Sequence, residues 1–255
     1  RDQGIHGLLI GATTREGACL ATDERLQMLA SLRQALPETP IVIGLNGMET
    51  LGTAAQAREL AQAKPQGLLV TAPPYVRPGQ TGIRRHFETI AAAADLPILI
   101  YDIPYRCGTE IGLDTLQALT RDPRIVGIKT CGASVDRLMR LIHETTLKVL
   151  IGEDNQFFAA LCLGAHGAIA ASAHFRPELW VRIFDLLREQ RLDEARHYAA
   201  LLQPMVRALF AEPNPAPIKA WLAAQGWINN ALRLPFVPAS ETCLAEIGRI
   251  ARLIP

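Results

Sequence analysis

The segment Ile125-Val126-Gly127-Ile128-Lys129-Thr130-Cys131-Gly132 is a short run of apolar and branched residues that reaches a lysine and then continues in small residues. Such a run predicts a buried β-strand with Lys129 at its carboxyl end. Burial disfavours the charged ammonium, so this side chain loses its proton more readily and becomes an amine nucleophile that can form a Schiff base. The alternative interpretation is a lysine that reaches solvent at the strand end or pairs with a carboxylate.

Lysine is scarce in this chain, since only four of the 26 basic residues are lysines. Lys64 closes an alanine-rich helical segment, Lys148 opens a predicted strand, and Lys219 follows a proline-rich turn. None of these three is expected to end a buried strand. Lys129 is therefore the candidate nucleophile.

A short apolar strand, a loop and an amphipathic helix follow one another seven times between residue 6 and about residue 190. The predicted strands are His6–Gly11, Pro40–Leu45, Gly67–Ala72, Pro97–Ile103, Ile125–Lys129, Lys148–Gly152 and Gly167–Ala171. The predicted helices are Asp23–Leu36, Thr53–Ala63, Gly82–Ala94, Leu113–Thr120, Val135–Glu144, Gln156–Leu163 and Pro177–Arg188. Continuous apolar strands joined by helices predict an α/β protein with a parallel sheet covered on both faces.

Seven units fit either an open doubly wound sheet or a closed (β/α)8 TIM barrel whose first unit precedes the numbered chain. We favour the barrel, because no nucleotide-binding fingerprint follows the first strand. Arg1–Gly4 is typical of the tail of a helix from that preceding unit. Residues 1–190 would then form the barrel domain and residues 191–255 a helical appendix. The helices expected in this appendix are Leu192–Ala211, Ile218–Gln225 and Glu241–Leu253.

The composition excludes several classes of protein. The 255 residues are 49% hydrophobic with a formal net charge of +1, and no cluster of basic and aromatic residues indicates a nucleic-acid or membrane surface. Five cysteines without a C-x-x-C pair fit the free thiols of a cytoplasmic protein. The six histidines lack metal-ligand spacing, and no glycine-rich loop fits a phosphate or dinucleotide. We expect small-molecule substrates, no metal and no other cofactor.

Polar residues are found at several predicted strand ends, where a (β/α)8 barrel carries its chemistry. Tyr101 is predicted on the strand next to that of Lys129, and a phenol hydrogen-bonded to a hydroxyl can relay the protons that imine formation requires. Thr13-Thr14 offers hydroxyls and N–H groups to a carboxylate, and Arg106 offers a planar guanidinium to a second one. Each has a structural alternative, namely packing for the tyrosine, an N-cap turn for the threonines and a surface ion pair for the arginine.

Three of the four tyrosines fall in these loops, at Tyr75, Tyr101 and Tyr105. In a chain with 5% aromatic residues this concentration indicates more than packing. Tyr75 and a threonine can complete the proton relay. Glu153-Asp154, after the sixth strand, better fits a structural or gating role.

Four motifs at the strand ends are similar to those of one enzyme family. They are Ala12-Thr13-Thr14-Arg15-Glu16, similar to G-T-T-G-E; Val70–Pro78, similar to V-T-P-Y-Y-N-x-P; Tyr101–Gly108, similar to Y-N-x-P-x-R-T-G; and Gly127-Ile128-Lys129, similar to G-[IV]-K. Over essentially the whole chain the sequence resembles the pyruvate-dependent class I aldolases, the family that contains dihydrodipicolinate synthase and N-acetylneuraminate lyase. Asn214–Lys219 and Leu232–Pro235 resemble the synthase branch.

The resemblance implies a (β/α)8 barrel with a C-terminal helical domain, assembled as a homotetramer of tight dimers. It implies that Lys129 forms an imine with pyruvate and that Tyr101 and Thr13 relay protons. Tyr75 would complete this relay from a neighbouring subunit.

The same resemblance assigns Thr14 to the pyruvate carboxylate, Ile169 to substrate binding and Arg106 to the carboxylate of an incoming aldehyde. The expected activity is the condensation of pyruvate with L-aspartate 4-semialdehyde to 4-hydroxy-tetrahydrodipicolinate, in lysine and diaminopimelate biosynthesis. Two alternatives stay open: imine chemistry with a sugar-acid or aromatic aldehyde, and a paralogue that binds keto acids without turnover.

The chain departs from the family pattern beside the expected site. Arg15 replaces a glycine that lets the loop turn closely, Pro74 replaces an aromatic residue at the subunit junction, and Thr130-Cys131-Gly132 replaces E-A-T. These changes bear on the identity of the aldehyde.

The positions of the family's lysine feedback site are also changed. The resemblance places that site at Thr22, Arg25, Glu49 and Thr53, where two histidines, an asparagine and a glutamate are usual. We therefore expect weak inhibition by L-lysine. Alternatively, Arg25 and Glu49 pair with each other across the subunit junction and stiffen it.

Overall fold

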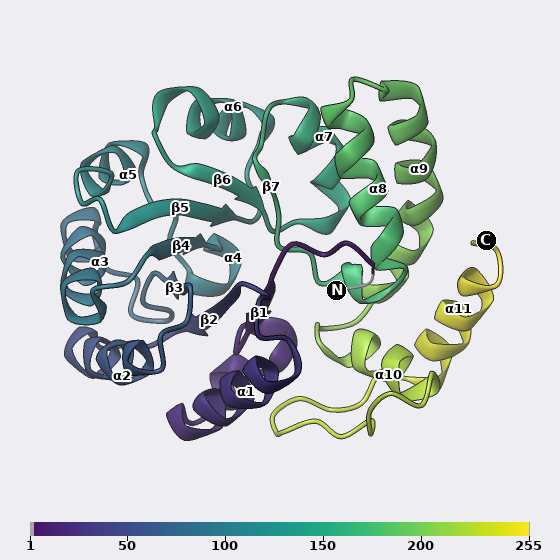
Figure 1. The fold of residues 1–255 in the computed structure, drawn as a ribbon, viewed down its shortest axis with the longest axis horizontal. Coiled ribbons are helices and arrows are strands. Elements are labelled where there is room, and N and C mark those ends of the chain that lie inside the picture. Colours follow the sequence, from purple (N-terminus) through teal and green to yellow (C-terminus); the bar gives the residue numbers. More distant parts are fainter. Residues whose placement is uncertain (1–2, 255) are drawn as a thin grey trace.

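The computed structural model describes residues 3–254 as an α/β fold built around a curled parallel sheet of seven strands (Figure 1). Each strand pairs in parallel with the next, from first to seventh, with no reversal of order. This order excludes the doubly wound alternative, in which the strand order reverses at a switch point. The strands are β1 (Leu8–Ile10), β2 (Ile41–Leu45), β3 (Gly67–Thr71), β4 (Ile98–Asp102), β5 (Ile125–Thr130), β6 (Lys148–Ile151) and β7 (Gly167–Ala168).

Helices connect the strands and cover the outer face of the sheet (Figure 1). They are α1 (Thr22–Ala35), α2 (Thr50–Gln62), α3 (Gln80–Ala94), α4 (Pro104–Cys107), α5 (Leu113–Leu119), α6 (Val135–Glu144), α7 (Phe157–Cys162) and α8 (Pro177–Arg188). All seven predicted strands and their helices are confirmed. The short helix α4 was not predicted, because four residues are too few to show a helical period.

The first and last predicted strands were too long, since His6–Gly11 was expected where β1 covers only Leu8–Ile10. Gly167–Ala171 was expected, whereas β7 ends at Ala168. The Ile169 N–H still donates to the Ile151 carbonyl at 3.0 Å, and the chain then turns into a 3₁₀ helix at Ser172–His174. The small apolar residues that suggested a longer strand therefore belong to the start of a turn.

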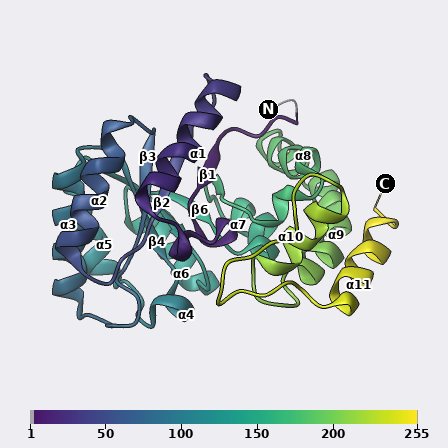
Figure 2. The same ribbon diagram turned by 90° about the horizontal axis from the view of Figure 1, so that it is seen from below.

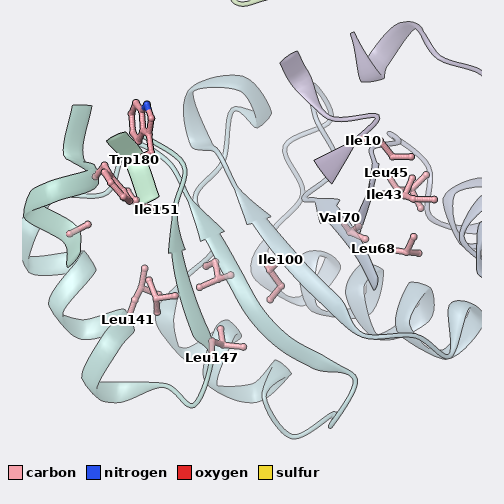
Figure 3. Close-up of a cluster of buried hydrophobic side chains, with 14 of the residues drawn as sticks. Ile10, Ile43, Leu45, Leu68, Val70, Ile100, Leu141, Leu147, Ile151 and Trp180 are labelled. Atoms are coloured by element: carbon pink, nitrogen blue, oxygen red, sulfur yellow. The ribbon is translucent and has the colours of Figure 1, made fainter. Parts of the chain in front are cut away.

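The core is made by branched side chains of the strands packed against the helices (Figure 3). Ile43, Leu68, Val70 and Ile100 are fully buried. Burial of one such side chain contributes about 1.5–3 kcal/mol, so these contacts hold the strand ends in fixed positions.

The C-terminal helices gather on one side of the sheet (Figure 2). They are α9 (Leu192–Leu209), α10 (Ala216–Ala224) and α11 (Glu241–Ala251), and α9 lies beside α8. A domain boundary near residue 190 stays a prediction.

Strands β1 and β7 are the two edges of the sheet in residues 3–254. The segment before β1 lies near α8 (Figure 1). There the His6 and Phe184 rings meet edge to face, with their centroids 5.4 Å apart. The expected helix tail at Arg1–Gly4 lies partly outside the described residues. Gln3 is in a turn and Gly4 has a φ of 81°, so neither is helical.

The register of the sheet brings the ends of β3, β4 and β5 together. Thr71 is opposite Tyr101, and Tyr101 is opposite Lys129. Neighbours in register in a parallel sheet direct their side chains to the same face. The Asp102 carboxylate, next along β4, accepts a 2.6 Å hydrogen bond from Arg137 of α6, which anchors this strand end to the adjacent helix.

Candidate active site

Lys129 is buried at the carboxyl end of β5. Its side chain is 7% exposed, and its Nζ lies 4.3 Å from the centroid of the Tyr101 ring. Desolvation lowers the pKa of this amine below its usual 10.5, against the opposing effect of Cys131, Asp154 and Glu153. The neutral, nucleophilic form is therefore favoured, as the sequence indicated.

Gly152, just after β6, leaves the space that the Lys129 side chain occupies. A Cβ at this position would lie 2.5 Å from Lys129 Cε and 2.4 Å from Cys131 Sγ. Both distances are shorter than any contact that carbon or sulfur atoms tolerate, so a side chain here would displace the amine. Sequence reasoning missed Gly152, because its role depends on the packing of two neighbouring strands.

Tyr101 and Thr13 come together beside Lys129. Burial raises the pKa of the Tyr101 phenol, Cys131 raises it further, and the nearby Thr13 side chain opposes this rise. The phenol therefore keeps its proton and has a hydroxyl partner through which a proton can pass. This contact is what the predicted relay requires.

The loop that carries Thr13 and Thr14 is held by the C-terminal helical region. Asn214 Nδ2 donates to Thr14 Oγ1 at 3.2 Å. The buried Glu16 carboxylate accepts from Lys219 Nζ and from the Arg233 N–H, both at 2.6 Å. Lys219, which the sequence suggested was an ordinary helical lysine, therefore forms an ion pair behind the candidate site.

The left-handed residue of this loop lies one position after the expected one, and the close backbone approach lies two positions after it. Arg15 is in a 3₁₀ helix and needs no glycine, whereas Glu16 has a φ of 54°. A Cβ at Gly17 would lie 2.0 Å from the Gly11 carbonyl oxygen. Gly17 thus provides the close approach that the family motif assigned to the position of Arg15.

Three predicted site residues lie outside this buried group. Tyr75 is 85% exposed and has a φ of 68°, Arg106 is exposed, and Ile169 is half-buried after β7. The Asp154 carboxylate accepts hydrogen bonds from the N–H groups of Ala171 at 3.2 Å and Ser172 at 2.5 Å, which fits the structural one of its two expected roles.

The side chains of Tyr105, after β4, and Glu153, after β6, contact each other near the end of β5. The Tyr105 hydroxyl donates to Glu153 Oε1 at 2.8 Å. The sequence placed both residues in strand-end loops but did not predict their contact.

A search of residues 3–254 finds no group of three or more His, Cys, Asp or Glu side chains that could hold a metal ion. No helix in the same residues is both long and apolar enough to cross a membrane.

A desolvated lysine and a buried tyrosine at adjacent ends of a parallel sheet are the arrangement of a Schiff-base-forming α/β enzyme. Residues 2–253 match the dihydrodipicolinate synthetase family, and the chain belongs to this family.

Three relatives illustrate the similarity. The 4-hydroxy-tetrahydrodipicolinate synthase of Xanthomonas axonopodis pv. citri is 34% identical over 251 residues, which cover 97% of this chain and 83% of the relative. The crystal structure of dihydrodipicolinate synthase from Thermotoga maritima has a TM-score of 0.95 and 29% identity, and the match covers 99% of this chain and 88% of that one. The synthase of Cyanidioschyzon merolae, solved with lysine bound, has a TM-score of 0.95 and 26% identity, covering 100% and 88% of the two chains.

The low pKa of Lys129 predicts how pyruvate addition depends on pH. The neutral amine forms as pH rises through the pKa, so the rate of adduct formation should rise with pH around a midpoint below 10.5. Borohydride trapping followed by mass spectrometry, between about pH 6 and 10, measures this rate. Lys129→Arg should form no adduct, and Lys148→Arg, at the exposed start of β6, should behave like the wild type. A midpoint at the usual value would show that the amine is not desolvated.

The Glu16–Lys219 pair predicts a link between stability and pyruvate binding. Lys219→Met leaves the buried Glu16 carboxylate with the Arg233 N–H alone, so the free energy of unfolding should fall by about 1–3 kcal/mol. The KM for pyruvate should rise several-fold, because the loop of Thr13 and Thr14 is released. Denaturant unfolding and steady-state kinetics measure the two effects, with Lys148→Met as control. An unchanged KM would show that Lys219 stabilises the fold without affecting pyruvate binding.

Proposed function

We propose that this protein condenses pyruvate with L-aspartate 4-semialdehyde to form 4-hydroxy-tetrahydrodipicolinate, a step in diaminopimelate and lysine biosynthesis. The observation that carries the proposal is the buried Lys129 amine in register with Tyr101. Support comes from relatives of this family that bear the name of this synthase and match nearly the whole chain.

The chemistry begins at Lys129. Its neutral amine attacks the C2 carbonyl of pyruvate, and the carbinolamine loses water to give a protonated imine. Loss of a methyl proton gives an enamine, whose carbon attacks the aldehyde. The amino group of the added semialdehyde then attacks the new imine carbon and displaces the Lys129 amine, which closes the ring of the product. Tyr101, with the Thr13 hydroxyl near it, supplies and removes the protons of these steps.

Thr14 holds the pyruvate carboxylate. Its Oγ1 accepts a hydrogen bond from Asn214 at 3.2 Å, so its own proton is free to donate to an anion. Ile169 provides an apolar contact near the end of β7. Arg106 binds the carboxylate of the aldehyde with a guanidinium that forms no ion pair within residues 3–254.

Tyr75 acts in a neighbouring subunit of a homotetramer. It is one of several large apolar side chains exposed on the loops and helix starts after β2 and β3, with Met48, Leu51 and Val76. Exposed apolar groups gathered in this way are typical of a protein interface. An eighth β/α unit between β1 and β7 would close the sheet into a barrel.

The proposed activity is tested by a condensation assay. Purified protein, pyruvate and L-aspartate 4-semialdehyde should give the product, detected by coupling to a reductase that consumes it. A panel of sugar-acid and aromatic aldehydes should react more slowly. Adduct formation on Lys129 without condensation of this semialdehyde would leave the imine chemistry in place and overturn the assigned acceptor; no adduct would overturn the enzyme class.

Tyr101→Phe tests the proton relay. The ring still packs in the same space, so the fold should be kept, while turnover should fall by roughly 10²- to 10⁴-fold, the usual effect of losing a positioned acid-base group. Circular dichroism and kcat measure the two quantities. A near-native kcat would remove Tyr101 from the relay.

The structure also supports a prediction about L-lysine. Arg25 is 3% exposed, and its guanidinium donates to the carbonyls of Gly17 at 2.5 Å, Leu20 at 2.6 Å and Gly44 at 3.2 Å. The Glu49 carboxylate accepts from two N–H groups at the start of α2. Each side chain is thus bonded within its own chain, and within residues 3–254 of one chain the two form no ion pair.

Millimolar L-lysine should therefore leave this enzyme almost uninhibited. Each lost polar partner costs about 1–3 kcal/mol, so two losses weaken binding by roughly a hundredfold or more. Initial rates against lysine concentration measure this, with the lysine-binding synthase of Cyanidioschyzon merolae assayed in parallel. Half-inhibition well below a millimolar would contradict this assignment of Arg25 and Glu49.

A further inference from the structure

Tyr105 bridges two strand-end loops across the end of β5. It belongs to α4, which follows β4, and its hydroxyl donates to Glu153 Oε1, after β6, at 2.8 Å. A hydrogen bond to a carboxylate is of the stronger, charge-assisted kind. Lys129 lies on the strand between these two loops.

The backbone at Gly132 allows this bridge. Gly132 has a φ of 72°, and a Cβ there would lie 3.4 and 3.6 Å from two atoms of the Tyr105 ring. The ring therefore packs over the backbone that follows β5. Tyr105 is still 63% exposed, so much of its ring meets solvent.

The Tyr105 hydroxyl reaches the group around the nucleophile through Cys131. Burial raises the pKa of the Cys131 thiol to about 11, against the opposing effect of the nearby Tyr101 and Tyr105 side chains. Cys131 Sγ and Lys129 Cε in turn lie over the same glycine, Gly152. Tyr105, Cys131 and Lys129 therefore form a continuous set of contacts from the surface to the amine.

We propose that Tyr105, held by Glu153, restricts the size of the aldehyde that reaches the imine on Lys129, so that compact acceptors are accepted and bulky ones are excluded. This inference rests on the proposed function, since it presumes a pyruvate imine at Lys129. Pyruvate itself is small and is not restricted. Tyr105 thus determines specificity and takes no part in proton transfer.

The test compares a compact with a bulky aldehyde in matched variants. Tyr105→Ser removes the ring, Tyr105→Phe keeps the ring but loses the hydrogen bond, and Glu153→Gln keeps an acceptor for that bond. For each, kcat/KM is measured with L-aspartate 4-semialdehyde and with benzaldehyde, and pyruvate adduct formation on Lys129 is followed by borohydride trapping.

In Tyr105→Ser we expect the kcat/KM for benzaldehyde, relative to the wild type, to rise about tenfold or more, the scale on which a pocket's shape discriminates between substrates. Tyr105→Phe should show a smaller rise, and Glu153→Gln should match the wild type. Pyruvate adduct formation should stay within about threefold of the wild type in all three.

Three results would overturn the proposal. One is a Tyr105→Ser variant that forms the adduct but gains nothing with benzaldehyde. Another is loss of condensation with both aldehydes while the adduct still forms, which would place Tyr105 in the chemistry. If Tyr105→Ser does not fold, a Tyr105→Phe variant whose kcat/KM for benzaldehyde does not rise would contradict the proposal. Failure of the proposed function is distinct, because the wild type itself would then form no adduct at Lys129.

Discussion

The burial of an amine without an ion-pair partner is the constraint on which this site depends. None of the ion pairs formed by the described residues includes Lys129. The nearby Asp154 carboxylate is already engaged by backbone N–H groups, and so it satisfies its own hydrogen bonds without drawing the ammonium to it. Strand β5 is paired on both sides, and Gly152 leaves room for the Lys129 side chain near its end. Lys129 is therefore shielded from water, which is the environment that favours an unpaired amine without charge.

The same constraint explains why the neighbours of Lys129 are weak acids. Tyr101 and Cys131 are buried beside it, and desolvation raises the pKa of both groups. A stronger acid in either place would lose its proton to the amine and trap it as an ammonium. Groups that keep their protons at neutral pH leave the amine free to react and can still pass a proton through hydrogen bonds.

Much of the fold and part of the site could be predicted from the sequence, because they depend on local patterns. Runs such as Ile125–Thr130 show strand and burial directly, and the strand order then places Tyr101 next to Lys129. The contacts of Glu16 with Lys219 and of Tyr105 with Glu153 could not be predicted, since they join residues 203 and 48 positions apart and no periodicity marks them. The exact end of β7 was missed because small apolar residues fit a strand and a turn equally well. The roles of Thr14, Ile169, Arg106 and Tyr75 stay predictions.

The bonds from Asn214, Lys219 and Arg233 to the loop after β1 have a thermodynamic consequence. The loop cannot be fully ordered unless the C-terminal segment is docked, so the two share one local opening equilibrium. By linkage, a ligand that binds only the ordered loop must also stabilise the docked helices. Binding of a ligand to the loop after β1 should therefore slow amide hydrogen exchange in α10. This helix would report that the site is occupied, although it contributes no reacting group to it.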